Sequence, residues 1–219
     1  SGLQLPQSTL AFRAMSTPAA SKTAVAPVLK RIVNERESQL RLVTSVRLRW
    51  MAVLGQLAAV ALIRLYYGFP FNSGNCLILI AMSAWLNVFL SIRYPARYRL
   101  STSLAFGLLV YDVLQLAGLL YFTGGIQNPF SVLLVAPVTV AAATQPMRYT
   151  FILGAIVIAA GGLLISFHDP LPWYEGLRFE LPRDYKIGSL TALVASMIFM
   201  AFYTWRLNKE ARQMSAALA

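Results

Sequence analysis

Cysteine, histidine and acidic residues are scarce in this 219-residue chain. The chain has one cysteine, Cys76, and one histidine, His168. It therefore has no cysteine pair for an intrachain disulfide and no Cys/His cluster for a metal ion. Eight acidic residues stand against 19 lysines and arginines, which gives a formal net charge of +11. The basic residues are spread over loops and tails and are not interleaved with aromatic residues on one surface, which argues against nucleic acid as a partner.

Apolar residues make up 58% of the chain and gather in long runs. Crossing a bilayer as a helix takes roughly 20 mostly apolar residues. The sequence therefore predicts an all-α, polytopic membrane protein with a six-transmembrane-helix bundle. The predicted spans are Leu48–Tyr67, Asn75–Tyr94, Thr102–Phe122, Pro129–Gln145, Tyr149–Phe167 and Ile187–Trp205. The fourth and fifth are short, and Pro146 and Arg148 between them predict a tight turn in place of one long kinked helix.

The placement of the basic residues sets the expected orientation. Most of them lie before the first span, in the loop from Arg93 to Arg99, at Arg148 and after the last span, whereas the first and third short loops have none. By the positive-inside bias, both termini are predicted to face the cytoplasm, where anionic lipid is the expected partner. Arg49, one residue past the predicted start of the first span, is assigned to the cytoplasmic tail, so Arg64 is the only basic residue placed inside a span.

The segments outside the spans are predicted to differ in order. Residues 1–27 are rich in Ser, Thr, Ala and Pro, which predicts a disordered tail, and the initial Ser1-Gly2 is typical of a cloning remnant. Residues 28–47 alternate charged and apolar side chains, which fits an amphipathic helix on the cytoplasmic membrane face or a solvated helix leading into the first span. Residues 206–219 are strong helix formers, so the last helix is expected to continue as a linker.

The uncharged heptapeptide Gly124–Phe130 joins the third and fourth spans. Gly124 can cap the preceding helix in a left-handed conformation. Asn128 followed by Pro129 is a preferred start for the next helix. Helix capping therefore explains three of the seven residues without any ligand.

The other residues of this region fit a flat, lipid-soluble ligand. Gly125 leaves room for a ring close to the backbone, and free amide groups near the helix start can donate hydrogen bonds to a carbonyl oxygen. Neighbouring aromatic side chains can stack on the same ring. A quinone combines a flat ring, two carbonyls and an apolar tail. The candidate quinone-binding residues are Tyr121, Phe122, Gly124, Gly125, Gln127, Asn128, Pro129 and Phe130.

Asp112 lies near the middle of the third span, where a carboxylate costs at least about 2.5–3.5 kcal/mol on insertion scales. Gln115 shares its helix face, and Gln56 and Asn87 in other spans are candidate hydrogen-bond partners. An interhelical hydrogen bond and an intramembrane proton site both fit. A small transporter or membrane-bound enzyme with Asp112 as proton relay, and a plain membrane anchor, therefore stay open as functions.

The stretch Gly124-Gly125-Ile126-Gln127-Asn128-Pro129-Phe130 resembles the GGxxNPF motif of the RegB/PrrB/ActS family of redox-responsive sensor histidine kinases. In that family the motif lies between the third and fourth of six membrane spans and is implicated in ubiquinone binding. The resemblance implies a ubiquinone-binding sensor domain in a bacterial inner membrane. It also implies a homodimer joined through the C-terminal helix, and a kinase core that acts on a response regulator.

The catalytic parts of that family are not recognisable in this sequence. Neither the phosphoacceptor-histidine helix nor the ATP-binding domain appears, so the resemblance implies a sensor domain without catalytic residues. Cys76 does not correspond to the family's cytoplasmic redox cysteine, because the predicted topology places it at the opposite membrane face.

Overall fold

A computed structural model describes residues 42–95, 100–174, 176–177 and 179–217 of the chain. The first helix, α2 (Leu42–Ala61), continues as a π-helical turn, η1 (Leu62–Tyr66). The further elements are α3 (Ser73–Arg93), α4 (Thr102–Phe122), the 3-10 segments η2 (Gly125–Gln127) and η3 (Pro129–Leu134), α5 (Val135–Thr144), α6 (Met147–Ser166) and α7 (Arg183–Ala217). The predicted tail at 1–27 and the part of the predicted amphipathic helix up to residue 41 lie outside the described residues.

The all-α membrane bundle is confirmed. Among the described residues, five helices are long and apolar enough to cross a membrane, and the shorter apolar helix Pro129–Thr144 supplies the sixth segment. The predicted span Thr102–Phe122 coincides with α4, and most other boundaries differ by a few residues. The first and last helices differ most, because α2 begins at Leu42, before the predicted start at Leu48, and α7 runs from Arg183 to Ala217, beyond both predicted ends at Ile187 and Trp205. The cytoplasmic orientation of both termini stays a prediction.

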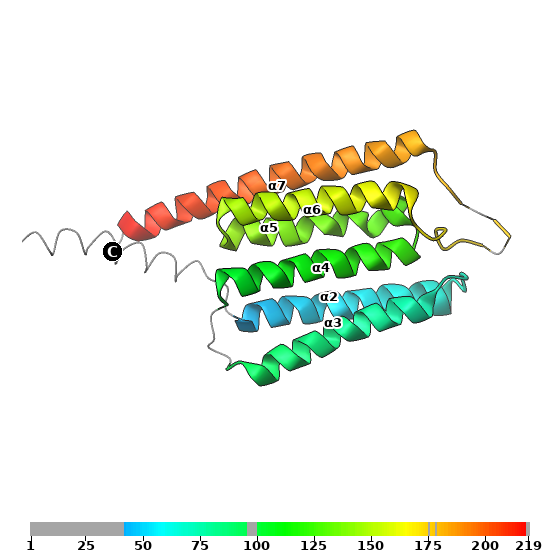
Figure 1. Cartoon of the computed structure of the whole chain (residues 1–219), viewed down its shortest axis with the longest axis horizontal. Coiled ribbons are helices and arrows are strands. Elements are labelled where there is room, and N and C mark those ends of the chain that lie inside the picture. Colours follow the sequence, from blue (N-terminus) through cyan, green and yellow to red (C-terminus); the bar gives the residue numbers. More distant parts are fainter. Residues whose placement is uncertain (1–41, 96–99, 175, 178, 218–219) are drawn as a thin grey trace, which may run out of the picture. The chain divides into compact units, whose positions relative to one another are not determined.

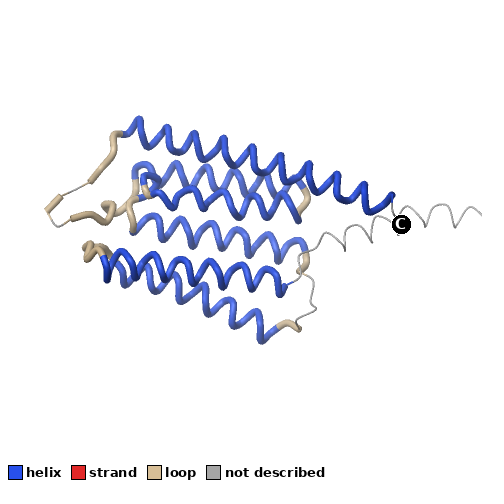
Figure 2. The backbone as a smooth tube through the Cα atoms, turned by 180° about the vertical axis from the view of Figure 1, so that it is seen from behind, coloured by secondary structure: helices blue, strands red, loops and turns tan. Residues whose placement is uncertain are grey.

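The helices of this unit run side by side (Figures 1 and 2). In both views α2 and α3 lie on one side of α4, while α5 and α6 lie on its other side, with α7 beyond them. α7 packs against α5 and α6, and α2 packs mainly against α3. α2 begins and α7 ends at the same end of the bundle, as six spans require, and the loop between α4 and α5 lies at the opposite end (Figure 1).

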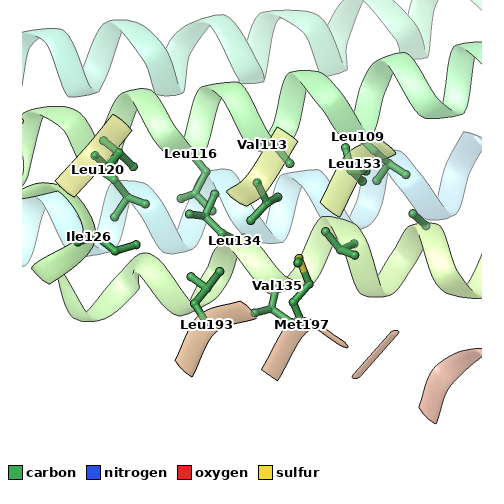
Figure 3. Close-up of a cluster of buried hydrophobic side chains, with 14 residues drawn as sticks. Leu109, Val113, Leu116, Leu120, Ile126, Leu134, Val135, Leu153, Leu193 and Met197 are labelled. Carbon is green, nitrogen blue, oxygen red and sulfur yellow. The ribbon is translucent and has the colours of Figure 1, made fainter. Parts of the chain in front are cut away.

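A buried apolar cluster fills the space between α4, α5, α6 and α7 (Figure 3). Its members are Leu109, Val113, Leu116, Leu120, Ile126, Leu134, Val135, Val138, Ala141, Leu153, Val157, Leu164, Leu193 and Met197. A close approach helps to form it, since an ideal Cβ on Gly161 of α6 would lie only 2.5 Å from Leu190 Cδ1 of α7. Because Ile126 belongs to this cluster, the core itself anchors the heptapeptide.

The other side of the bundle has smaller clusters. Val53 of α2, Cys76 and Ile80 of α3, and Leu119 of α4 form one of them. Cys76 is fully buried there and carries no disulfide. α3 thus joins α2 to the rest of the bundle.

Candidate functional site

The heptapeptide forms the two helix caps that its sequence predicts. α4 ends at Phe122, and Gly124 follows with a left-handed φ of 108°. The Asn128 side chain caps η3 by accepting a hydrogen bond from the Phe130 backbone N–H at 2.9 Å, and Pro129 is the first residue of η3. These local signals account for the chain reversal between α4 and α5.

Both glycines of the heptapeptide are closely packed. An ideal Cβ on Gly124 would lie 2.5 Å from Leu171 Cδ1. Gly125 has a φ of 65°, and its ideal Cβ would lie 2.5 Å from the Leu164 carbonyl oxygen and 2.7 Å from His168 Cγ. The space beside Gly125 was predicted to hold a flat ring. In the structure it is occupied by Leu164 of α6 and by His168.

The heptapeptide region is also bonded to the loop that leads into α7. Gln127 Oε1 accepts a hydrogen bond from the Leu181 N–H at 2.9 Å, and the Tyr121 carbonyl accepts one from the Asp169 N–H at 2.7 Å. Within the described part of the chain, the buried Gln127 Nε2 has no hydrogen-bond partner. α7 begins at Arg183, directly after this loop. The turn between α4 and α5 is therefore fastened to the start of the last helix.

A buried lysine strengthens that connection. Lys186 of α7 places Nζ 3.1 Å from His168 Nε2 and 3.0 Å from Glu180 Oε1. Because an ammonium only donates, His168 Nε2 accepts here, and its Nδ1–H donates to the Asp169 carbonyl at 2.8 Å. His168 packs against Gly125 as well, so the heptapeptide, this loop and α7 meet at one histidine. This group is not predictable from the sequence, because its members are neighbours only in the fold.

Asn128 has a second set of bonds, on the α4 side. Its Nδ2 donates to the Thr123 carbonyl at 2.8 Å and to Thr123 Oγ1 at 2.9 Å. The Thr123 hydroxyl in turn donates to the Leu119 carbonyl at 2.8 Å. Both protons of the Asn128 amide and the hydroxyl proton of Thr123 are therefore used within the protein.

A cavity of about 420 Å³ lies between α2, α3, α4, η3 and α5. Its volume falls in the range of about 300–1,000 Å³ that is usual for small-molecule sites. The residues around it include Arg49, Gln56, Val60, Cys76, Ser83, Asp112, Gln115, Leu116, Leu119, Thr123, Asn128, Phe130, Leu133, Pro137 and Val140. Of the predicted site residues, Asp112, Gln115, Asn128 and Phe130 line this cavity, whereas Tyr121, Phe122, Gly124, Gly125, Gln127 and Pro129 do not.

Asp112 forms an ion pair with Arg49 of α2. Arg49 Nε lies 2.9 Å from Asp112 Oδ1, and Arg49 Nη2 lies 3.0 Å from Asp112 Oδ2. The guanidinium also donates to the Leu108 carbonyl and lies 5.8 Å from the centre of the Tyr111 ring. The arginine side chain is only 4% exposed, against 31% for the aspartate. A bidentate pair of this kind satisfies the carboxylate inside the bundle.

This partner corrects the sequence analysis, which placed Arg49 with the cytoplasmic tail and Arg64 alone inside a span. The structure places Arg49 within the candidate span Thr44–Tyr66. The expectation that Gln56 meets this polar face is confirmed through Gln115, with Gln56 Nε2 3.3 Å from Gln115 Oε1 and Gln115 Nε2 3.0 Å from Gln56 Oε1.

The other expected partner of Asp112 and Gln115, Asn87, bonds elsewhere. Asn87 of α3 donates to the Val46 carbonyl of α2 at 3.1 Å. The spacing of these residues agrees with the observed pairing but does not select it. Arg49 and Gln56 are seven residues apart and share one helix face, as do Asp112 and Gln115 at three residues apart.

Comparison with known proteins identifies the family. The sequence pattern of the PilS-like transmembrane domain matches residues 34–219. The chain belongs to this family. The PilS-like domain is 39% identical over 178 residues to the sensor histidine kinase RegB of Cereibacter sphaeroides, which covers 81% of the chain and 38% of that RegB. A second RegB of the same species is 39% identical over 186 residues, covering 84% of the chain and 40% of the relative.

The PilS-like domain thus spans 38–40% of the length of the curated relatives it matches. The resemblance to the membrane region of RegB-type kinases is confirmed, and with it a multi-pass location in a bacterial inner membrane. No solved structure matches the chain.

Proposed function

We propose that this PilS-like domain is the membrane sensor of a histidine kinase, that it binds ubiquinone in the cavity, and that it reports the redox state of the quinone pool. The position of Asn128 and Phe130 carries the proposal. Both belong to the stretch that resembles the GGxxNPF quinone motif, and both line the cavity. The Phe130 side chain is 47% exposed, so its ring face is available to an apolar ligand. The mostly aliphatic walls suit an isoprenoid tail.

The contacts of the heptapeptide offer a route from the cavity to the exit helix. Asn128 and Phe130 line the cavity, while Gln127 of the same turn holds Leu181 just before α7. α5, which follows Phe130, also packs against α7. A ligand that shifts the start of the fourth segment would therefore shift α7, which continues to Ala217 beyond the predicted span end at Trp205. A coupling free energy of about 1–3 kcal/mol is enough for such regulation.

The remaining partners belong to the same proposal. The C-terminal part of α7 would join two copies into a homodimer and connect them to a kinase core, which would act on a response regulator. Basic residues at the predicted cytoplasmic edges, such as Arg148 and Arg206, would bind anionic lipid headgroups.

The distribution of polar groups favours ligand binding over proton transport. Asp112 and Gln115 are polar, but the next α4 residues on the cavity wall toward the heptapeptide are Leu116, Leu119 and Leu120. A proton path needs a chain of titratable groups or water, and this aliphatic stretch interrupts it. A plain membrane anchor would have no use for a cavity at all.

The proposal is tested by measuring ubiquinone bound to the purified chain. Phe130→Ala removes a ring from the cavity wall, and Phe151→Ala removes an equally large ring from an exposed position on α6, away from the cavity. Ubiquinone is added to the protein in nanodiscs of defined phospholipid, and the bound fraction is extracted and quantified. Aromatic contacts are worth about 0.5–1.5 kcal/mol, so Phe130→Ala should weaken binding about two- to tenfold. Phe151→Ala should bind like the unmodified chain.

Two results would overturn the proposal. One is an unmodified chain that neither retains nor takes up ubiquinone. The other is equal binding by the Phe130→Ala and Phe151→Ala variants.

A further inference from the structure

We propose that a carbonyl oxygen on the ring of the bound ligand accepts a hydrogen bond from one amide of the Gln56–Gln115 pair, and that the tail of the ligand, not its ring, contacts Phe130. This inference rests on the proposed function and assigns the polar half of the same cavity. It shifts ring recognition from the heptapeptide to the interface between α2 and α4.

On the cavity wall, the heptapeptide has no side-chain N–H or O–H group left to donate a hydrogen bond to a ligand. Asn128 donates both amide protons to Thr123, and the Thr123 hydroxyl donates to the Leu119 carbonyl. The Phe130 backbone N–H is used by the Asn128 cap. Gln127 has an amide without a partner among the described residues, but it does not line the cavity. A carbonyl placed at this end would meet donors that are already bonded.

The glutamine pair has donors left. Each amide carries two N–H donors, and the reciprocal bonds of 3.3 Å and 3.0 Å use one from each. One N–H on Gln56 and one on Gln115 therefore remain for a ligand, and both residues line the cavity. An amide oxygen has two lone pairs and also accepts hydrogen bonds, so the pair can bind either a carbonyl oxygen or a hydroxyl group on the ring.

The neighbouring ion pair positions this amide pair. α2 packs mainly on α3 and reaches α4 across the cavity through its long polar side chains. The Arg49–Asp112 pair fixes the separation of the two helices close to Gln56 and Gln115. Arg49 and Asp112 act here as positioning residues, because they hold α2 and α4 where the two amides bond each other on the cavity wall.

The spacing along α4 separates the ring from the heptapeptide. Gln115 and Thr123 are eight residues apart, which is about 12 Å of helix rise. A ring bonded at Gln115 therefore directs its tail along the aliphatic stretch toward Phe130. Changes at the glutamine pair should therefore affect ligands with and without a tail, whereas a change at Phe130 should affect only ligands with a tail.

The test compares two ubiquinone probes on the full chain in nanodiscs, one without an isoprenoid tail and one with two isoprenoid units. The double variant Gln56→Met/Gln115→Met removes both amides at nearly constant side-chain length, so neither is left without its partner. It should weaken binding of both probes about tenfold. Phe130→Ala should weaken only the tailed probe. Thr191→Val, a polar-to-apolar change on the exposed face of α7, is the control and should change neither.

The outcomes separate the two claims. Equal binding of both probes by the double variant and the unmodified chain would overturn the inference and leave the proposed function standing. No binding to the unmodified chain would overturn both. Infrared spectra of a carbonyl-labelled probe bound to the unmodified chain give a second measurement that needs no variant. The carbonyl stretch should lie below its value in an apolar solvent, and an unshifted band would contradict the inference.

Discussion

Arg49 and Asp112 form an ion pair between the first and third membrane helices, with Arg49 Nε 2.9 Å from Asp112 Oδ1. The pair lines the cavity and connects α2 to α4, which the Gln56–Gln115 bonds also join. Removing one member of a buried pair leaves the other charge without its counter-ion, which is more costly than removing both.

Single changes in this pair should therefore destabilise the bundle more than the double change. Asp112→Leu leaves the nearly buried Arg49 unpaired and should lower the free energy of unfolding by about 3–5 kcal/mol. Arg49→Met should cost less, because Asp112 is partly exposed. The double variant should recover much of the loss. Unfolding in mixed detergent micelles measures all three, and strictly additive losses would contradict this coupling.

Gly125→Ala should destabilise the turn between α4 and α5. Its φ of 65° costs an L-residue about 1–2 kcal/mol, and the added Cβ would also meet the Leu164 carbonyl and His168. Gly162→Ala in α6 is the matched control, because no atom lies within 4 Å of an ideal Cβ there, and helix propensity then favours alanine by up to about 1 kcal/mol. Thermal unfolding in nanodiscs should separate the two variants clearly. A Gly125→Ala protein as stable as Gly162→Ala would show that the turn relaxes freely.

The membrane segments and helix caps are predictable from the sequence because they depend on local properties. Apolar run length alone locates Thr102–Phe122, and the Asn128-Pro129 pair predicts the start of η3. The extension of α7 beyond Trp205 follows from helix-forming composition. In each case, residues close in the chain supply the whole signal.

The interactions between distant segments are not predictable in this way. Arg49 stands in a strongly basic stretch and is therefore assigned to the tail, whereas the packed bundle buries it against Asp112. The occupant of the space beside Gly125, His168, comes from beyond α6. Composition gives no information on which of several polar side chains faces another, so the Arg49–Asp112 pairing required the packed bundle.

Gln127→Leu should loosen the loop before α7. The change removes the acceptor of the Leu181 N–H, and a typical hydrogen bond contributes about 0.5–1.5 kcal/mol. Hydrogen–deuterium exchange of the peptide that contains Leu181 should accelerate about two- to tenfold. Gln145→Leu, at the far end of α5, is the control, because Gln145 Oε1 has no hydrogen-bond partner within the described part of the chain. Unchanged exchange at Leu181 in the Gln127→Leu protein would contradict this role.

Cys76 should resist alkylation in the folded protein. It borders the cavity, but its side chain is fully buried against Val53 and Ile80, so a maleimide reaches the thiol only when the surrounding side chains move apart. Labelling in native membranes should be far slower than labelling in denaturing detergent. A Leu65→Cys protein that lacks Cys76 supplies an exposed reference thiol at the end of the same helix pair. Equal labelling rates for the two thiols in native membranes would show that α2 and α3 open readily.

The 3-10 geometry of η3 changes the reach of the shortest membrane segment. Six residues at a rise of about 2.0 Å and ten at about 1.5 Å span about 27 Å, whereas 16 α-helical residues span about 24 Å. The hydrocarbon core of a typical bilayer is about 30 Å thick, so stretching the backbone removes about half of the mismatch. Because this stretched part carries Phe130, changes in bilayer thickness act directly on a wall of the cavity.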